Sequence, residues 1–196
     1  MTKIKNILEY LIASVKRMCY DLGNRRVKKN NMIMNKEGLL NVRDLACYIK
    51  CRFFDRYGKK ISPIKLQKSL YFCFAYWGGF VLKSKDTEEE IEENPYLFKA
   101  VFKAWTYGPV IPTIYHEEQA GTLNDNITEY ELFKDNDFLK ETINSLLDDL
   151  FEISDFKLVN LAHSDNCWKN NFDMNAAKHD TIIDCDDIIN EYAIKC

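Results

Sequence analysis

Residues 103–115 constrain the fold of this chain more than any other stretch, because they hold a Gly-Pro pair between aromatic residues and a second proline. Gly108 can adopt backbone angles that other residues resist, while Pro109 fixes its own φ and has no N–H to donate. Pro112 suits the first turn of a helix, where a missing N–H does no harm. The sequence therefore predicts a rigid corner followed by a helix, with Gly108, Pro109 and Pro112 as structural residues.

This corner is expected to hold two aromatic side chains, Trp105 and Tyr107, in a defined place, and Tyr115 follows in the predicted helix. Aromatic residues dominate the energetics of protein–protein contacts, so these three are candidate partner-binding residues. The alternative is that they pack against the body of their own domain. The stretch contains no nucleophile, metal ligand or phosphate cradle, which favours a binding function over catalysis.

Composition favours a folded and mainly helical protein. Of the 196 residues, 46% are hydrophobic and 13% aromatic, which is enough to build a core. Only 7 glycines and 4 prolines are present, too few for an all-β sandwich with many tight turns. We predict a compact helical domain with a small β-hairpin over residues 39–196, preceded by a basic amphipathic helix and linker over residues 1–38.

The first 36 residues are basic, and the rest of the chain is acidic. Nine lysines and arginines against two acidic residues give this arm a charge of +7, which leaves −10 for the remainder of a chain with a net charge of −3. Such an arm can bind an acidic partner or nucleic acid, or dock on its own acidic body. Residues 2–20 show the spacing of an amphipathic helix, which suits a membrane surface, a partner groove or the domain itself.

Capping residues delimit the predicted helices. One helix is expected to follow Asn41 and to end near Gly58, and another to begin at Ser62-Pro63. The second is apolar on most faces and is the predicted core helix, in which Gly78-Gly79 permit a break or a close approach of another backbone. We also expect helices at 112–119, from Asp137, from Ser154 and at 184–195, a hairpin or strand pair within 97–105, and loops at 83–95, 122–134 and 170–184.

Seven cysteines show no disulfide or zinc spacing. Their number is odd and no two form a CxxC pair, so we expect reduced thiols in a cytoplasmic protein. The sequence has no run of about 18 apolar residues and no secretory cleavage pattern, so we expect no membrane span. It also lacks a metal-ligand cluster and a glycine-rich phosphate loop, so we expect no metal and no cofactor.

Three separated pieces of the sequence agree with one family. They are residues 64–72 (IKLQKSLYF), residues 104–110 (AWTYGPV) and residues 158–163 (LVNLAH) followed by Trp168. In this order they resemble the Panacea domain, the SocA-like antitoxin domain that also occurs in phage-associated GepA-like proteins. The resemblance covers about residues 40–172, and the second piece is the most specific. The family usually has Thr before the histidine, where this chain has Ala162.

The resemblance implies a mostly helical domain that neutralises an unrelated toxin by direct contact and, in one member, delivers that toxin to a protease as an adaptor. It implies no catalytic residue. We therefore expect a cognate toxin as the partner, with a protease as a further one, and the basic arm as a partner-specific part. The matching pieces add Lys65, Lys68, His163 and Trp168 to the candidate partner-binding residues. The alternatives to partner binding are a solvated helix face for the two lysines and a helix cap or a buried core position for His163.

Two other functions stay open at this stage. Helices at 41–56 and 62–77 followed by a hairpin resemble the order of a winged helix, so the chain can be read as a nucleic-acid-binding regulator, although only the arm supplies a positive face. The same arm would serve a phage counter-defence protein. A hydrolase would need His163 to act with Cys167 or with Asp165, and no residue that would orient such a pair is identifiable.

Overall fold

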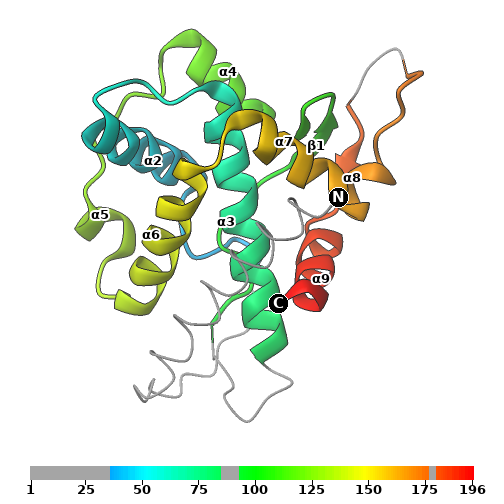
Figure 1. Cartoon of the computed structure of the whole chain (residues 1–196). Helices are drawn as coiled ribbons and strands as arrows, with labels where there is room; N and C mark the ends of the chain where they lie inside the picture. The colour runs from blue at the N-terminus through cyan, green and yellow to red at the C-terminus, as the bar shows by residue number, and fades with distance from the viewer. Residues whose placement is uncertain (1–35, 85–92, 177–179) are drawn as a thin grey trace.

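The computed structural model describes residues 36–84, 93–176 and 180–196, which form a helical body with a small antiparallel sheet at one side (Figure 1). The expected helix at 2–20, nearly all of the linker and most of the acidic loop lie outside these residues. The predicted mainly helical fold with a minor β element is confirmed. Its helices are α2 (Val42–Tyr57), α3 (Pro63–Ser84), α4 (Pro112–Ala120), α5 (Glu129–Phe133), α6 (Asp137–Glu152), α7 (Asp155–Ser164), α8 (Asn166–Lys169) and α9 (Cys185–Lys195).

Helix α3 runs through the centre of the body, and α2, α6, α7 and α9 surround it (Figure 1). Every residue of α3 from Lys65 to Gly79 is buried. A helix that is apolar on all faces must be covered on all faces, so this one helix organises the packing of the others. The predicted core helix is thereby confirmed.

The Gly78-Gly79 pair lets α9 approach the backbone of α3. A Cβ atom added at Gly79 would lie 2.5 Å from the carbonyl carbon of Tyr192, and one at Gly78 would lie 2.6 Å from Cγ1 of Ile189. The helix continues past the pair to Ser84, so the close approach is confirmed and the break is not. Glycine stays helical here because α9 covers it and the surrounding apolar residues hold it in place.

Capping explains where the first helices begin and end. The side chain of Asn41 accepts hydrogen bonds from the backbone N–H groups of Arg43 and Asp44, and Gly58 ends α2 with a φ of 65°. The hydroxyl of Ser62 accepts from the backbone N–H of Lys65 at 3.0 Å. These ends agree with the predicted ones, since each depends on a local backbone bond that the sequence displays.

Later helices differ from the prediction in two positions and in one capping bond. Asn136, rather than Asp137, caps α6 through its side chain. Helix α5 lies within the stretch expected to be a loop. Its capping box, formed by Thr128 and Glu131, is a sequence pattern that could have predicted the start of this helix. Ser154 precedes α7 as expected but makes no capping bond through its side chain.

The sheet has the order β2-β1-β3, with strands Phe102–Trp105 (β1), Gly108–Val110 (β2) and Ile182–Ile183 (β3). Trp105 pairs with Gly108, so Thr106 and Tyr107 form the hairpin loop. The predicted hairpin within 97–105 is therefore displaced along the chain, because the Gly-Pro pair supplies the second strand. Strand β3 occupies a stretch expected to be irregular, and its two residues are too few to show alternation.

No helix in the described ranges is both long enough and apolar enough to cross a membrane.

The close approach at Gly79 can be tested by Gly79→Ala. Alanine favours a helix over glycine by about 1 kcal/mol, yet here we expect the substitution to lower the free energy of unfolding by about 2–3 kcal/mol, because its methyl group meets the backbone of α9. Urea unfolding followed by circular dichroism measures the change.

Gly58→Ala is the matched control for this substitution, because a Cβ at Gly58 meets nothing within 4 Å. We expect it to cost about 1 kcal/mol through the left-handed backbone alone. Equal stability of Gly79→Ala and the wild-type protein would contradict the packing of α9 on α3.

Candidate functional site

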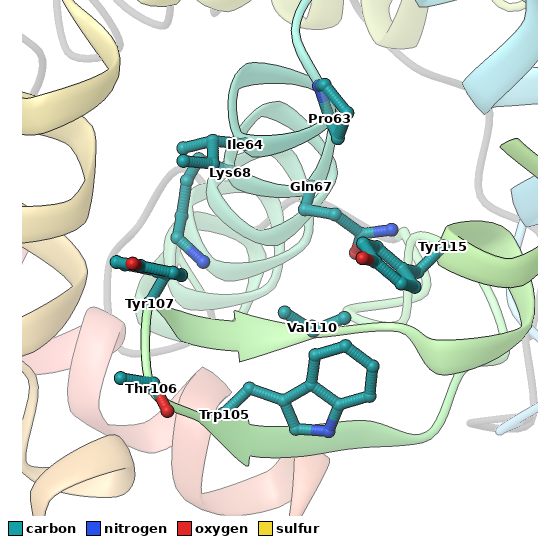
Figure 2. Close-up of a pocket in the computed structure, with 9 residues that line it drawn as sticks. All are labelled: Pro63, Ile64, Gln67, Lys68, Trp105, Thr106, Tyr107, Val110 and Tyr115. Carbon is teal, nitrogen blue, oxygen red and sulfur yellow. The ribbon is translucent and has the colours of Figure 1, made fainter. Parts of the chain in front are cut away.

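A pocket of about 410 Å³ opens between α3, the β1–β2 hairpin and α4 (Figure 2). Its walls are mostly apolar, and its size suits a small ligand or one or two amino-acid side chains. It is the natural candidate site, because it joins the most specific sequence motif to the core helix. The lining residues are Pro63, Ile64, Gln67 and Lys68 from α3, Trp105, Thr106, Tyr107 and Val110 from the hairpin, and Tyr115 from α4.

Three aromatic candidates predicted from the sequence meet at this pocket. Figure 2 shows Tyr107 and Tyr115 on opposite sides of it, with Trp105 between them along the hairpin. The rings of Trp105 and Tyr115 pack edge to face with their centroids 5.1 Å apart. Tyr107, at the hairpin loop, is 63% exposed. The structure thus gives Trp105 and Tyr115 half-buried wall positions and leaves Tyr107 free to contact another molecule.

The hairpin is held by side chains that donate to its backbone carbonyls. The amine of Lys68 donates to the carbonyl of Pro109 at 2.8 Å, and the indole N–H of Trp168 donates to that of Trp105 at 3.0 Å. Nε2 of His163 bonds the carbonyl of Thr106 at 3.1 Å, so this nitrogen carries the proton. The three sequence pieces that agree with one family therefore converge on one hairpin.

His163 and Trp168 support the hairpin and are absent from the pocket lining. The imidazole stacks on the indole with ring centroids 4.0 Å apart and planes 15° apart, and the indole stacks in turn on Phe172 at 4.6 Å. Burial lowers the pKa of His163 from its ordinary value, which keeps the ring neutral and able to serve as the Nε2–H donor. Both residues act as positioning residues for the turn.

Gly108 is required at the hairpin for two separate reasons. Its φ of 93° lies in the region that side chains disfavour. A Cβ added there would also lie 3.0 Å from the amine of Lys68 and 3.2 Å from the Cβ of Ala162. The carbonyl of the neighbouring Pro109 accepts a hydrogen bond from the amine of Lys68, and Pro112 lies in the first turn of α4. The three structural residues thus form a continuous corner.

Lys68 is buried, with 1% of its surface exposed, at the wall of the pocket. Burial lowers its pKa from 10.5 to about 7, although the charge of Asp165 acts in the opposite direction. The alternative of a solvated helix face for Lys65 and Lys68 is therefore wrong, since both are buried. It fails because the hairpin and α7 cover the stretch of α3 that carries the lysines.

Lys65 is also buried, but it lies apart from the pocket. Its amine donates to the carbonyl of Phe151 at 3.1 Å and to that of Ile153, and thereby satisfies carbonyl groups at the end of α6. This contact explains its burial without a partner. The structure therefore separates Lys65 from the other candidate residues.

Asp165 and Cys167 belong to a buried network rather than to an acid–base pair with His163. The carboxylate of Asp165 accepts from Tyr71 at 2.6 Å, Tyr192 at 3.0 Å and Lys195 at 2.6 Å. The thiol of Cys167 lies 3.3 Å from the hydroxyl of Tyr71, and burial raises its pKa to about 12. A thiolate is strongly disfavoured there, so the arrangement needed for a nucleophile and its base is not formed.

The remaining lining residues were not singled out in the sequence. Oε1 of Gln67 accepts from the backbone N–H of Ile111 at 2.8 Å, which fixes the short link between β2 and α4. Ile64, Gln67 and Lys68 fall at i, i+3 and i+4, so their helical spacing could have placed them on one face. Within the described ranges, no group of three or more His, Cys, Asp or Glu side chains is arranged to hold a metal.

Comparison of the chain with models of protein families, with curated proteins and with solved structures found no match. The likeness to the Panacea domain accordingly stays a prediction. The function of the pocket has to be inferred from its geometry, which offers an exposed aromatic tip, an apolar cavity and a buried amine.

The low pKa of Lys68 can be tested by the pH dependence of stability. An unfolded lysine keeps its proton up to about pH 10, whereas folded Lys68 loses it above about pH 7. Because the unfolded state then binds more protons, we expect wild-type stability to rise with pH, relative to Lys68→Met, by about 1.4 kcal/mol per pH unit between pH 7 and 9. Below pH 7 the difference should be constant.

Urea unfolding at several pH values measures this difference. Loss of the bond to Pro109 shifts the Lys68→Met curve by a constant amount and does not affect its slope. Lys103→Met is the control, since that amine pairs with Asp180 at the surface. Parallel pH curves for the wild type and Lys68→Met would contradict a depressed pKa.

Proposed function

We propose that this protein is a non-enzymatic binding protein of the antitoxin type, which holds a toxic partner protein inactive through the pocket beside the hairpin. One observation carries the proposal. Tyr107 is 63% exposed and lines a mostly apolar pocket, on a loop whose own and neighbouring carbonyls are bound by three side-chain donors. A large exposed aromatic on a rigid loop is the expected form of a binding anchor.

Rigidity of the hairpin supports tight binding. An antitoxin has to hold its partner strongly, and nanomolar affinity corresponds to roughly −12 kcal/mol. Ordering a loop on association lowers affinity, so a loop ordered beforehand keeps more of the contact energy. Here Lys68, His163 and Trp168 order the loop before any partner arrives. Trp105 and Tyr115 then form the wall against which a partner side chain packs.

Protein binding explains the described surface better than nucleic-acid binding. Arginines of α2 are committed to ion pairs, with Arg43 on Glu117, Arg52 on Asp148 and Arg56 on Glu152. Helix α3, which occupies the recognition position of a winged-helix order, is buried and offers no face to a groove. We therefore expect any nucleic-acid contact to be made through residues 1–38, whether the protein is an antitoxin, a regulator or a phage counter-defence factor.

The same proposal extends to the cellular location of the complex and to the role of the basic arm. Six cysteines of the described chain are free thiols, which suits a cytoplasmic complex. The basic arm contributes partner-specific contacts, and delivery of the bound toxin to a protease is the further role that an adaptor would have.

Co-expression tests the proposal. The gene adjacent to this one is expressed alone, then with the wild-type protein, and then with variants. We expect growth arrest by the neighbour alone, recovery with the wild type, and co-purification of the two proteins. Tyr107→Ala and Trp105→Ala should weaken the complex at least about tenfold, as loss of a hot-spot aromatic does.

Tyr130→Ala is the matched control, because Tyr130 is equally aromatic and 74% exposed but lies on α5, away from the hairpin (Figure 1). Circular dichroism and thermal unfolding check that Tyr107→Ala and Trp105→Ala stay folded. Full rescue by a folded Tyr107→Ala, Trp105→Ala double variant would contradict the pocket as the binding site.

A further inference from the structure

Within the residues that the structure describes, the amine of Lys68 is buried and has no carboxylate hydrogen-bonded to it. Within the described part of the chain its one hydrogen-bond acceptor is the carbonyl of Pro109, at 2.8 Å. A lysine amine has three donors, and a buried charge normally finds an opposite charge. Figure 2 shows the amine ending between Tyr107 and Val110, inside the ring of side chains that lines the pocket. The place from which a partner anion can reach it is therefore the pocket.

The pocket lining contains no acidic residue that would repel such an anion. Lys68 is its one charged member, and the other eight lining residues are uncharged. The acidic group whose charge acts on the Lys68 amine, Asp165, is fully buried and already bound by Lys195, Tyr71 and Tyr192. The acidic excess of the chain thus does not extend into this cavity.

We infer that the pocket receives an acidic side chain of the partner protein, whose carboxylate pairs with the amine of Lys68 while its apolar neighbours pack on Trp105 and Tyr107. This inference rests on the proposed function and names the chemistry of the partner. A side chain suits the site because Lys68 is only 1% exposed, so the carboxylate has to stand at the end of a slim stem. The apolar walls suit the stem and the residues beside it.

Pairing should be linked to uptake of a proton. An amine that is largely neutral above pH 7 has to gain a proton to attract a carboxylate, so affinity should fall about tenfold per pH unit above pH 7. The other ionisable groups near the amine are Lys65 on its own helix, His163 of α7, Asp165 between α7 and α8, and the phenols of Tyr107 and Tyr115. His163 is neutral in this range because burial lowers its pKa, and Lys65 and Asp165 are engaged elsewhere.

Capped peptides test the inference with the full-length protein. The probe is the pentapeptide Ala-Leu-Glu-Leu-Ala, acetylated and amidated so that its glutamate is the one carboxylate, and its twin has glutamine in place of glutamate. A third peptide has glutamine and a free C-terminus. Binding is followed by NMR titration, and proton uptake by calorimetry at pH 8 in two buffers of different ionisation enthalpy.

We expect the glutamate peptide to bind at least about tenfold more tightly than the glutamine twin, with uptake of close to one proton. Lys68→Met should abolish both the preference and the uptake, whereas Lys103→Met, outside the pocket lining, should keep them. Equal binding of the two capped peptides, binding without proton uptake, or binding through the free C-terminus alone would overturn the inference. The proton measurement needs only the wild-type protein, so it decides even if Lys68→Met does not fold.

Failure of this inference can be distinguished from failure of the proposed function. Suppose that a partner binds and that Tyr107→Ala abolishes the complex, but that the affinity of the wild-type protein does not change between pH 7 and 9. The binding function is then supported, and the pairing of a partner carboxylate with Lys68 is refuted. If the glutamate peptide binds with proton uptake but no neighbouring gene product is neutralised, the pocket chemistry stands and the antitoxin role falls.

Discussion

Burial of α3 from Lys65 to Gly79 is the constraint on which the rest of the structure depends. A helix covered on every side needs neighbours on every side, and α2, α6, α7 and α9 take these positions. Gly78 and Gly79 allow α9 to lie directly on the α3 backbone, so the end of the described chain closes the core. The buried carboxylate of Asp165 then joins Tyr71 of α3 to Tyr192 and Lys195 of α9.

The same helix also builds the candidate site, because side chains of its first two turns line the pocket. Lys68 is the link between the two, since its stem packs in the body and its amine holds the hairpin at Pro109. His163 and Trp168 hold the other side of the turn. A hairpin with a two-residue loop, a left-handed glycine and short strands has little intrinsic stability. Donors from three helices therefore keep Tyr107 in one place.

The sequence predicted those parts of the fold that depend on local chemistry. Asn41, Gly58, Ser62 and Pro112 mark helix ends through backbone bonds or a fixed φ, and the all-round apolar pattern of α3 identifies a core helix. It did not predict β3, because a two-residue strand exists only by pairing with β1.

Prediction of the site was also partial, for a related reason. The sequence predicted the Trp105–Pro109 corner as a rigid segment that holds aromatic side chains in a defined place. The sequence did not predict the burial of Lys65 and Lys68, because that burial depends on which distant segments cover α3. The same holds for His163 and Trp168, whose role as donors to hairpin carbonyls requires contacts across more than fifty residues of sequence. Local spacing cannot report such contacts.

The most direct test of the central claim, that the partner sits on the hairpin, is photo-crosslinking in cells. A photoreactive phenylalanine analogue is placed at position 107 or at position 130, both of which carry exposed tyrosines, and the adjacent gene is co-expressed. We expect a crosslink to its product from position 107 and none from position 130. Crosslinking from position 130 with none from position 107 would contradict the account and place the partner on another face.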